Sequence, residues 1–467
     1  MVVLRKRTAG TIVGIYILLM VLTGRVCAQK NNISLANLVD SASRYLPTLL
    51  EKKAQVNNAK AGVTDAKHAF VPKLNMVEEV TVSTDNDLAG GFLPFGGILH
   101  GISGGINASN NYQPQTGNLA SFYAEYELVN FGLRGAKVDN AQAYVGVKQA
   151  DLGKEIYLVK LQVAKTYFDI IKNTFQLGVD ERNIERYNDM YSITTALTST
   201  GVNAGVDSSL AKAELSKAKI DLFQRTGTLN QLKQQLQYLT SVPWQQIDVD
   251  TTAKHWEKYI NNLTGHFADS VNNPLLDYYL VQKQWNVSNE TLISKSYLPK
   301  IMVGAGGWAR GSSIQYNNDY GNTAEGFGYQ RLNYTAGIGI TYDLSNGLHK
   351  KDKLAMAHFS TVAADEAVKQ TKLSLNNESL QADEAIRTAN KTLAELPIQL
   401  DAAQNAYDQK LAQYQAGVIN LVDLTNATFV LYQAQTNYIS MLNEWYLANL
   451  EKAAVTGNLD LFIQTVK

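Results

Sequence analysis

Apolar and polar residues alternate with a period of two in four segments of the chain. The alternation is clearest over 120–128 and 332–344, and it is weaker over about 74–82 and 300–310. This period predicts β-strands with one apolar and one polar face. Such strands are typical of a membrane β-barrel, but a half-buried soluble sheet has the same pattern, so the strands alone leave both open.

A period of seven marks two much longer segments, at about 133–198 and 349–414. A seven-residue apolar repeat predicts helices with a coiled-coil seam along their whole length, and 66 residues would reach on the order of 100 Å. Pro397 interrupts the second segment and predicts a kink. The repeating residues are Ile156, Val163, Ile170, Leu177, Ile184 and Tyr191, then Ile386, Leu393, Leu400, Tyr407 and Tyr414.

Each long helix is expected to end at a glycine, Gly201 or Gly417. Glycine is favoured there because the residue after a helix often adopts a positive φ. Beyond each glycine the chain is expected to return as a shorter helix, at about 204–240 and about 420–457. The pattern therefore predicts two helical hairpins.

The two halves of the chain repeat one another. A shorter helix, at about 33–69 and again at about 269–295, precedes each strand pair and ends at an aromatic–x–Pro–Lys sequence, because the residue before proline is disfavoured in a helix. Tyr126–Asn130 recurs as Tyr342–Asn346, a shift of 216 residues, and the hairpin turns recur at the same shift. We predict a first repeat at 29–245, a connector at 246–268 that wraps the hairpins, and a second repeat at 269–467.

The N-terminal residues 1–28 resemble a secretory signal peptide. Arg5, Lys6 and Arg7 precede an apolar run that ends near Ala28, and the run is too short for a good membrane-spanning helix. An uncleaved anchor is the alternative. Lipid attachment at Cys27 is disfavoured, because Arg25 and Val26 stand where small residues are needed.

The amino-acid composition argues against several functional classes for this chain. The chain has 42 basic and 42 acidic residues, and loss of a leader with four basic residues leaves a net charge of about −4, which argues against a nucleic-acid partner. The lone cysteine excludes a disulfide scaffold. The six histidines show no metal-binding spacing, and no nucleophile or phosphate-loop motif is present, so we expect no cofactor, no metal and no enzyme activity.

Long polar loops, at about 84–118 and 312–330, join the strands of each pair, as in outer-membrane barrels. Four strands are too few to close a barrel, since the smallest have about eight. An open sheet edge is not tolerated in lipid, because its backbone groups would lose their hydrogen bonds. If these strands cross a membrane, several copies of the chain must pool them.

The tip sequence Tyr414–Asp423, the downstream Ala427 and Leu431, and the Phe70–Pro72 helix end resemble those of the TolC-like outer-membrane efflux proteins. The resemblance covers about Ser34 to Gly457. It implies a mixed α and β fold in which a homotrimer forms a twelve-stranded barrel in outer-membrane lipid, continued by an α-helical barrel in the periplasm. It also implies partners, a periplasmic adaptor and an inner-membrane pump, in tripartite efflux or type I secretion in a Gram-negative bacterium.

The resemblance also implies roles for residues at the hairpin tips. Asp423 falls on an acidic position that lines the periplasmic aperture, Asp207 corresponds in the first repeat, and Asn426 stands where relatives often have an aspartate. The alternative is that these aspartates only stabilise the start of a returning helix. Tyr414 matches a tyrosine that latches the closed aperture, but its usual basic partner would fall at Ile419.

The tip residues Gly201, Val202, Gly417 and Val418 match those that meet the adaptor, although simple turn glycines are equally compatible. A second function stays open beside the conduit. It is a barrel-anchored, trimeric coiled coil with a structural or adhesive role and no transport. The cargo and the class of pump cannot be read from the chain.

Overall fold

The computed structural model describes residues 33–86, 108–199, 205–249, 273–316 and 319–466. The expected signal peptide, Gly201, Val202 and most of the expected connector lie outside these residues. The described chain forms two compact units. The helical unit contains the chain up to Ala54, Gln149–Tyr279 and the chain from Val368, and the sheet unit contains Gln55–Lys148 and Leu280–Ala367.

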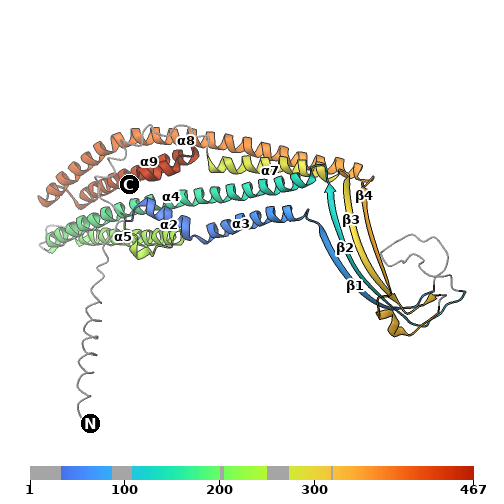
Figure 1. The fold of residues 1–467 in the computed structure, drawn as a ribbon. Coiled ribbons are helices and arrows are strands. Elements are labelled where there is room, and N and C mark those ends of the chain that lie inside the picture. The colour runs from blue at the N-terminus through green and yellow to red at the C-terminus, as the bar shows by residue number, and fades with distance from the viewer. Residues whose placement is uncertain (1–32, 87–107, 200–204, 250–272, 317–318, 467) are drawn as a thin grey trace, which may run out of the picture. The chain divides into compact units, whose positions relative to one another are not determined.

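The main elements occur twice in the same order, a helix, two strands, a long helix and a returning helix (Figure 1). In the first half they are α2 (Leu35–Tyr45), α3 (Pro47–His68), β1 (Lys73–Ser83), β2 (Gln115–Val129), α4 (Leu133–Ser199), α5 (Gly205–Thr240) and the short η1 (Trp244–Gln246). In the second half they are α7 (Pro274–Ser296), β3 (Lys300–Ser312), η3 (Thr323–Phe327), β4 (Arg331–Thr341), α8 (Asn346–Gln415), α9 (Leu421–Val455) and α10 (Leu459–Thr465).

The single helix expected over 33–69 is two helices, α2 and α3. Leu46 separates them in an extended conformation with ψ 121°, as expected for a residue that precedes proline. Pro47 then begins α3, where its missing N–H is not needed. Pro397 lies inside α8, which continues as a helix on both sides of it.

The four strands form one antiparallel sheet in the order β1-β2-β3-β4. Each strand pairs with its neighbours in sequence, so β1 and β4 are the two edges (Figure 1). Both predicted strand pairs are confirmed. The weakly alternating strands β1 and β3 have 11 and 13 residues, and the clearly alternating β2 and β4 have 15 and 11. The pairing of β2 with β3 joins the two halves of the chain within one sheet.

The register assigns each side chain to one of two faces. Phe122 of β2 pairs with Met76 of β1 and Gly307 of β3, and Gly307 pairs with Tyr334 of β4, so these residues share the apolar face. Ser121, Trp308 and Asn333 share the opposite, polar face. Every residue of β4 is exposed, including those of its apolar face. The alternation predicted from sequence is thus present as two distinct faces, and the apolar one is not covered in a single chain.

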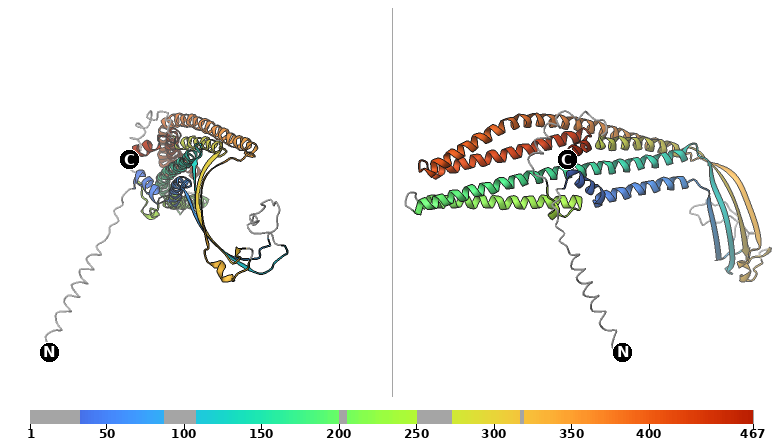
Figure 2. Two further views of the ribbon diagram at one scale, coloured as in Figure 1. Left: turned by 45° about the vertical axis from the view of Figure 1, so that its right-hand side comes forward. Right: turned by 60° about the vertical axis from the view of Figure 1, so that its left-hand side comes forward.

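In the helical unit, α5 runs back along α4 and α9 runs back along α8, so the two predicted hairpins are present (Figures 1 and 2). The predicted seven-residue repeat faces inward. Of its eleven residues, Val163, Ile170, Tyr407 and Tyr414 are buried, and the other seven are half-buried. A second buried row on α8 lies between the predicted positions, which gives the three–four spacing of a coiled coil. Its members are Ala382, Ala389, Leu396 and Ala403.

The largest core of the helical unit combines residues from both ends of the chain. Phe168 of α4 stacks on Tyr446 of α9, with ring centres 5.2 Å apart, and meets Phe462 of α10 edge-on. Leu35 and Leu38 of α2 complete this core. The short C-terminal helix α10 is therefore an internal part of the fold.

Among the described residues, no helix is both long enough and apolar enough to cross a membrane.

Candidate functional site

The turn between α8 and α9 contains several of the predicted site residues. Gly417 has a φ of +72°, in the left-handed region that favours glycine. Its N–H donates to the Tyr414 carbonyl at 3.0 Å, and the Val418 N–H donates to the Gln413 carbonyl at 2.9 Å. These two bonds form a Schellman motif, which satisfies the free carbonyls at the end of α8. Gly417 therefore ends the helix as predicted, and Val418 is exposed at the tip.

Asp423 lies in the first turn of α9. Asn420 is the N-cap of that helix, and its side chain accepts a hydrogen bond of 2.9 Å from the Asp423 main-chain N–H. Because Asn420 supplies the cap, the Asp423 carboxylate is not needed for it. The partly exposed carboxylate still benefits from the helix dipole. Asn426 is exposed one turn further along the same face of α9.

Asp207 has the corresponding place in the first turn of α5 and is also partly exposed. The structure therefore puts Asp207 and Asp423 at equivalent positions at the starts of the two returning helices. Gly201 and Val202 lie outside the described residues.

Tyr414 is buried and joins the two hairpins. Its hydroxyl lies 2.7 Å from Oγ1 of Thr194, which is near the C-terminal end of α4. The Thr194 hydroxyl donates to the Met190 carbonyl at 2.7 Å. A threonine hydroxyl has one proton, so Tyr414 is the donor and Thr194 the acceptor. The bond links residues that are 220 positions apart in sequence.

Ile419 packs against the apolar cluster near the tips that also contains Tyr414, so no cation stands at that position. The basic partner implied by the family resemblance is replaced by apolar contact and by the Thr194 hydrogen bond. This cluster draws on α4, α5, α8 and α9. Its buried members are Tyr187, Met190, Ala211, Leu215, Ala218, Ala403, Tyr407, Tyr414, Leu421, Leu424, Leu431 and Ala434.

A half-buried cation, Arg186, lies beside Tyr407, which precedes Tyr414 by seven residues in α8. The Arg186 guanidinium lies over the Tyr407 ring, 5.6 Å from its centre, and Arg186 Nη1 donates to Gln435 Oε1 at 3.3 Å. Burial lowers the pKa of the Arg186 guanidinium below its usual value. Burial also raises the pKa of the neighbouring Tyr187 to about 12, with the charges of Glu214 and Asp221 adding to the effect.

Sequence reasoning missed a buried acidic residue in the middle of α4. The Asp180 side chain is 1% exposed and pairs with Arg225 Nε of α5 at 3.0 Å. Tyr432 of α9 donates to Asp180 Oδ1 at 2.9 Å, and Gln176 donates to the same oxygen at 3.3 Å. This Asp180 cluster ties three helices together. Burial and the Asp180 charge raise the pKa of Tyr432.

The sequence contains a signal for the burial of Asp180, although not for its partners. The α4 residues three positions after each predicted heptad residue are all buried, and several are polar. A polar residue at a core heptad position specifies register or partner at a cost in stability. The row consists of Val159, Thr166, Asn173, Asp180, Tyr187 and Thr194.

No group of three or more histidine, cysteine, aspartate or glutamate side chains gathers as a metal site in the part of the chain that the structure describes.

Comparison with known proteins places these features in context. A protein-family model described as outer membrane efflux protein matches residues 38–241 and 291–458. The outer membrane protein TolC of Vibrio cholerae is 20% identical to this chain over 428 residues, which is 91% of each protein.

Solved structures share the fold at low sequence identity. The outer membrane protein VceC of Vibrio cholerae matches with a TM-score of 0.71 at 14% identity, over 91% of this chain and 96% of that one. The MtrE outer membrane channel of Neisseria gonorrhoeae, in its open state, matches with a TM-score of 0.65 at 17% identity, over 91% and 89%. The α10 helix lies just beyond the C-terminal limit of the family match.

Proposed function

This chain belongs to the outer membrane efflux protein family, and from that membership we propose that it is the outer-membrane exit duct of a tripartite efflux pump. In such a pump an inner-membrane protein supplies the energy and a periplasmic adaptor joins it to the duct. The strands would then lie in the outer membrane of a Gram-negative bacterium, and the hairpins would extend into the periplasm. Type I secretion is a second use of the same duct.

The sheet supports a trimer. Its apolar face is uncovered in one chain, with Leu332 and Tyr334 of β4 83% and 91% exposed, and its two edges β1 and β4 have unpaired backbone groups. Neither an apolar face nor an open edge is stable in water, and an open edge is not tolerated in lipid. Three copies of a four-stranded sheet would close a barrel of twelve strands, with the apolar faces toward lipid.

Two measurements on the purified protein test this function. The protein in detergent should have the mass of three chains, and it should form ion-conducting channels in planar lipid bilayers. A monomeric mass or electrically silent bilayers would contradict the exit duct. Silent bilayers together with a trimer would favour the structural or adhesive alternative.

At the lower end of the duct, Asp207, Asp423 and Asn426 would line the aperture. Three copies of each aspartate would give two acidic rings, which favour cations. The double variant Asp207→Ala with Asp423→Ala should lose most of the cation preference and conduct more. The matched variant with glutamate at both positions keeps the charge and should keep the preference. Unchanged ion selectivity in the alanine variant would remove both residues from the aperture.

Tyr414 would act as the latch of the closed aperture through its bond to Thr194. The Gly201–Val202 and Gly417–Val418 tips would contact the adaptor. A photo-crosslinking residue at the exposed Val418 should capture a periplasmic protein in cells, whereas one at Tyr334 on the sheet should not. A conducting channel with no capture at Val418 would reject the tip contact and leave the exit duct standing.

A further inference from the structure

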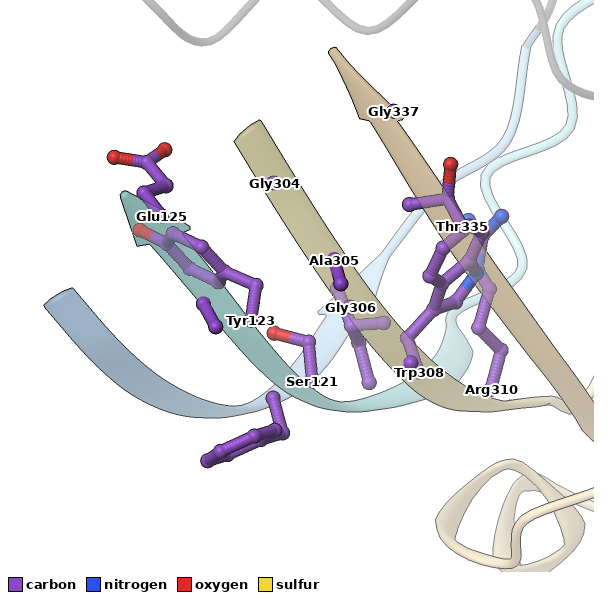
Figure 3. A pocket seen from close by; sticks show the side chains of 14 residues that line it. Ser121, Tyr123, Glu125, Gly304, Ala305, Gly306, Trp308, Arg310, Thr335 and Gly337 are labelled. Carbon is purple, nitrogen blue, oxygen red and sulfur yellow. The ribbon is translucent and has the colours of Figure 1, made fainter. Parts of the chain in front are cut away.

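The polar face of the sheet contains a hollow of about 580 Å³. Gly304 and Gly306 of β3 and Gly337 of β4 lie in its floor, so the floor is largely bare backbone, and Tyr123 and Trp308 stand beside it (Figure 3). A Cβ atom added at Gly306 would lie 3.0 Å from the Tyr123 Cβ, so glycine is what lets the two strands and this ring fit together. The volume is in the range of small-molecule sites.

Arg310 lines one end of the hollow and belongs to an unusual pair of like charges. Arg310 of β3 lies directly opposite Arg331 of β4 in the register, so both side chains leave the same face from Cα atoms about 5 Å apart. Like charges directly opposite each other destabilise a sheet. No carboxylate among the described residues forms an ion pair with either arginine.

The nearest acid on this face of the sheet does not relieve the pair. Leu119 of β2 stands opposite Arg310, and Glu79 of β1 stands opposite Leu119. Glu79 is thus two strand spacings, about 10 Å, from the arginine row. Because no acid on this face lies close enough to neutralise them, the two arginines attract an anion from outside the chain.

Trp308 stands two residues from Arg310 on the same strand and face, and Figure 3 shows its ring and the Arg310 side chain at the same end of the hollow. Tryptophan stacks with flat rings, and arginine binds carboxylate, sulfonate or phosphate groups through paired hydrogen bonds. Because Trp308 and Arg310 are neighbours, one small molecule can stack its aromatic ring on the tryptophan and bind the arginine through its acidic group.

Glu125 defines the other end of the hollow. It pairs with Gly304, six residues from Arg310 along β3 or about 20 Å. Its exposed carboxylate lies directly opposite Lys73 of β1 in the register, so the two opposite charges balance at that end. The net positive charge of this face therefore lies at the arginine end of the hollow, which favours a ligand with one anionic end and a neutral remainder.

We propose that Trp308, Arg310 and Arg331 form a binding site for small aromatic monoanions on the polar face of the sheet. The inference rests on the proposed function, because this face would line the duct and the bound molecules would be cargo on its way out. Three chains would bring three such sites into one lumen.

The test uses the assembled protein in planar bilayers with 2-naphthalenesulfonate as the probe. The probe should reduce the current in a concentration-dependent way. Methanesulfonate, which has no ring, and 2-naphthylmethylammonium, which has the opposite charge, should have little effect at the same concentrations. Calorimetric titration of the protein in detergent with the same three compounds gives a readout that does not depend on conduction.

Arg310→Gln and Arg331→Gln should each weaken the effect of the probe about tenfold, the loss expected for one charge-assisted pair of hydrogen bonds. Arg310→Lys should restore part of it, and Trp308→Leu should weaken it to a similar degree. Two controls should not change it, Lys73→Gln on the same face and Tyr334→Leu on the opposite face.

A conducting channel that the probe neither blocks nor binds would overturn the aromatic-anion site and leave the exit duct intact. A block of equal strength in wild type and in both arginine variants would also overturn it. If bilayers are silent, the exit duct is contradicted, and the calorimetric titration alone decides the site.

Discussion

Tyr414 donates a hydrogen bond of 2.7 Å to Thr194, and this bond joins the C-terminal end of α8 to the C-terminal end of α4. Both partners are buried, at 1% and 0% exposed, so water does not compete for the bond. Thr194 in turn donates to the backbone of its own helix. The two hairpins are thus connected by a buried hydrogen bond near their tips, in addition to the polar contacts of Asp180 with Tyr432 and of Arg186 with Gln435.

Tyr414→Phe should lower the free energy of unfolding by about 1 kcal/mol, because the ring stays and Thr194 merely loses a donor. Thermal unfolding in detergent, followed by circular dichroism, measures this. The control is Tyr407→Phe, one heptad earlier, which keeps the ring beside Arg186 and should be nearly neutral. If the latch proposal holds, Tyr414→Phe alone also raises channel conductance, and equal conductance would reject the latch.

The Asp180 cluster should be sensitive to removal of one partner. Asp180→Leu installs the residue found at the equivalent place of the second repeat, Leu396, but leaves Arg225 without its carboxylate, and should cost about 3 kcal/mol. Adding Arg225→Met, after the equivalent Met441, removes that orphan charge. The double variant should recover about half of the loss.

The same thermal unfolding experiment checks both Asp180 variants. Glu384→Gln serves as the control, since the exposed Glu384–Arg387 pair should contribute less than about 0.5 kcal/mol. A double variant no more stable than Asp180→Leu would show that Arg225 tolerates the loss of its partner.

The ion pairs of Asp151 should make the stability of the fold depend on pH. Burial would raise the pKa of its carboxyl, but hydrogen bonds from Lys52 at 2.6 Å and from Lys154, paired at 3.0 Å, outweigh burial and hold that pKa below its usual 3.8. The hydrogen bond to Asp151 raises the pKa of Lys52 above its usual 10.5. The stabilisation is therefore complete at neutral pH, is lost as the pH falls below 3.8, and is also lost above 10.5.

Asp151→Asn should accordingly cost about 1–2 kcal/mol at pH 7 and progressively less toward pH 3. Unfolding temperatures of wild type and variant across this range measure the difference. A gap that stays constant down to pH 3 would contradict the depressed pKa of Asp151.

Gly417→Ala should cost about 1 kcal/mol, because alanine is strained at a φ of +72° although a Cβ there meets no atom within 4 Å. Gly153→Ala, in the interior of α4 with the same open space, should instead stabilise by about 0.5–1 kcal/mol. Opposite signs in thermal unfolding identify backbone conformation as the cause. A destabilising Gly153→Ala would contradict this reasoning.

Phe462→Ala in α10 should cost about 3–5 kcal/mol, because the ring is fully buried against Phe168. The adjacent Leu461 is 45% exposed, and Leu461→Ala should cost less than about 1 kcal/mol. Similar losses for the two variants would show that α10 is not part of the core.

The repeating patterns of the chain predicted the elements well. Val163 and Ile170 recur at seven residues and are buried. The alternation over 332–344 became β4 as far as Thr341, with its apolar residues on one face, and the last three residues lie beyond the strand. Gly417 ends its helix with the expected positive φ. The break at Leu46 was readable from the following proline, and the single expected helix was the wrong interpretation of that signal.

The contacts that position the candidate sites were not readable in this way. Nothing in the sequence couples Tyr414 to Thr194 or brings Arg225 and Tyr432 to Asp180, because each pair is far apart along the chain. Similarly, Arg310 faces Arg331 only in one register of β3 and β4, and a slip of one residue would turn either side chain to the other face.

The sequence by itself therefore determined the helices, the strands, the duplication and the family resemblance, because periodicity, glycine and proline act on neighbouring residues. Only the tertiary structure decided which polar groups meet. Strand register and the packing of four helices at the tips depend on the shapes of side chains hundreds of residues apart, and no local pattern records those shapes.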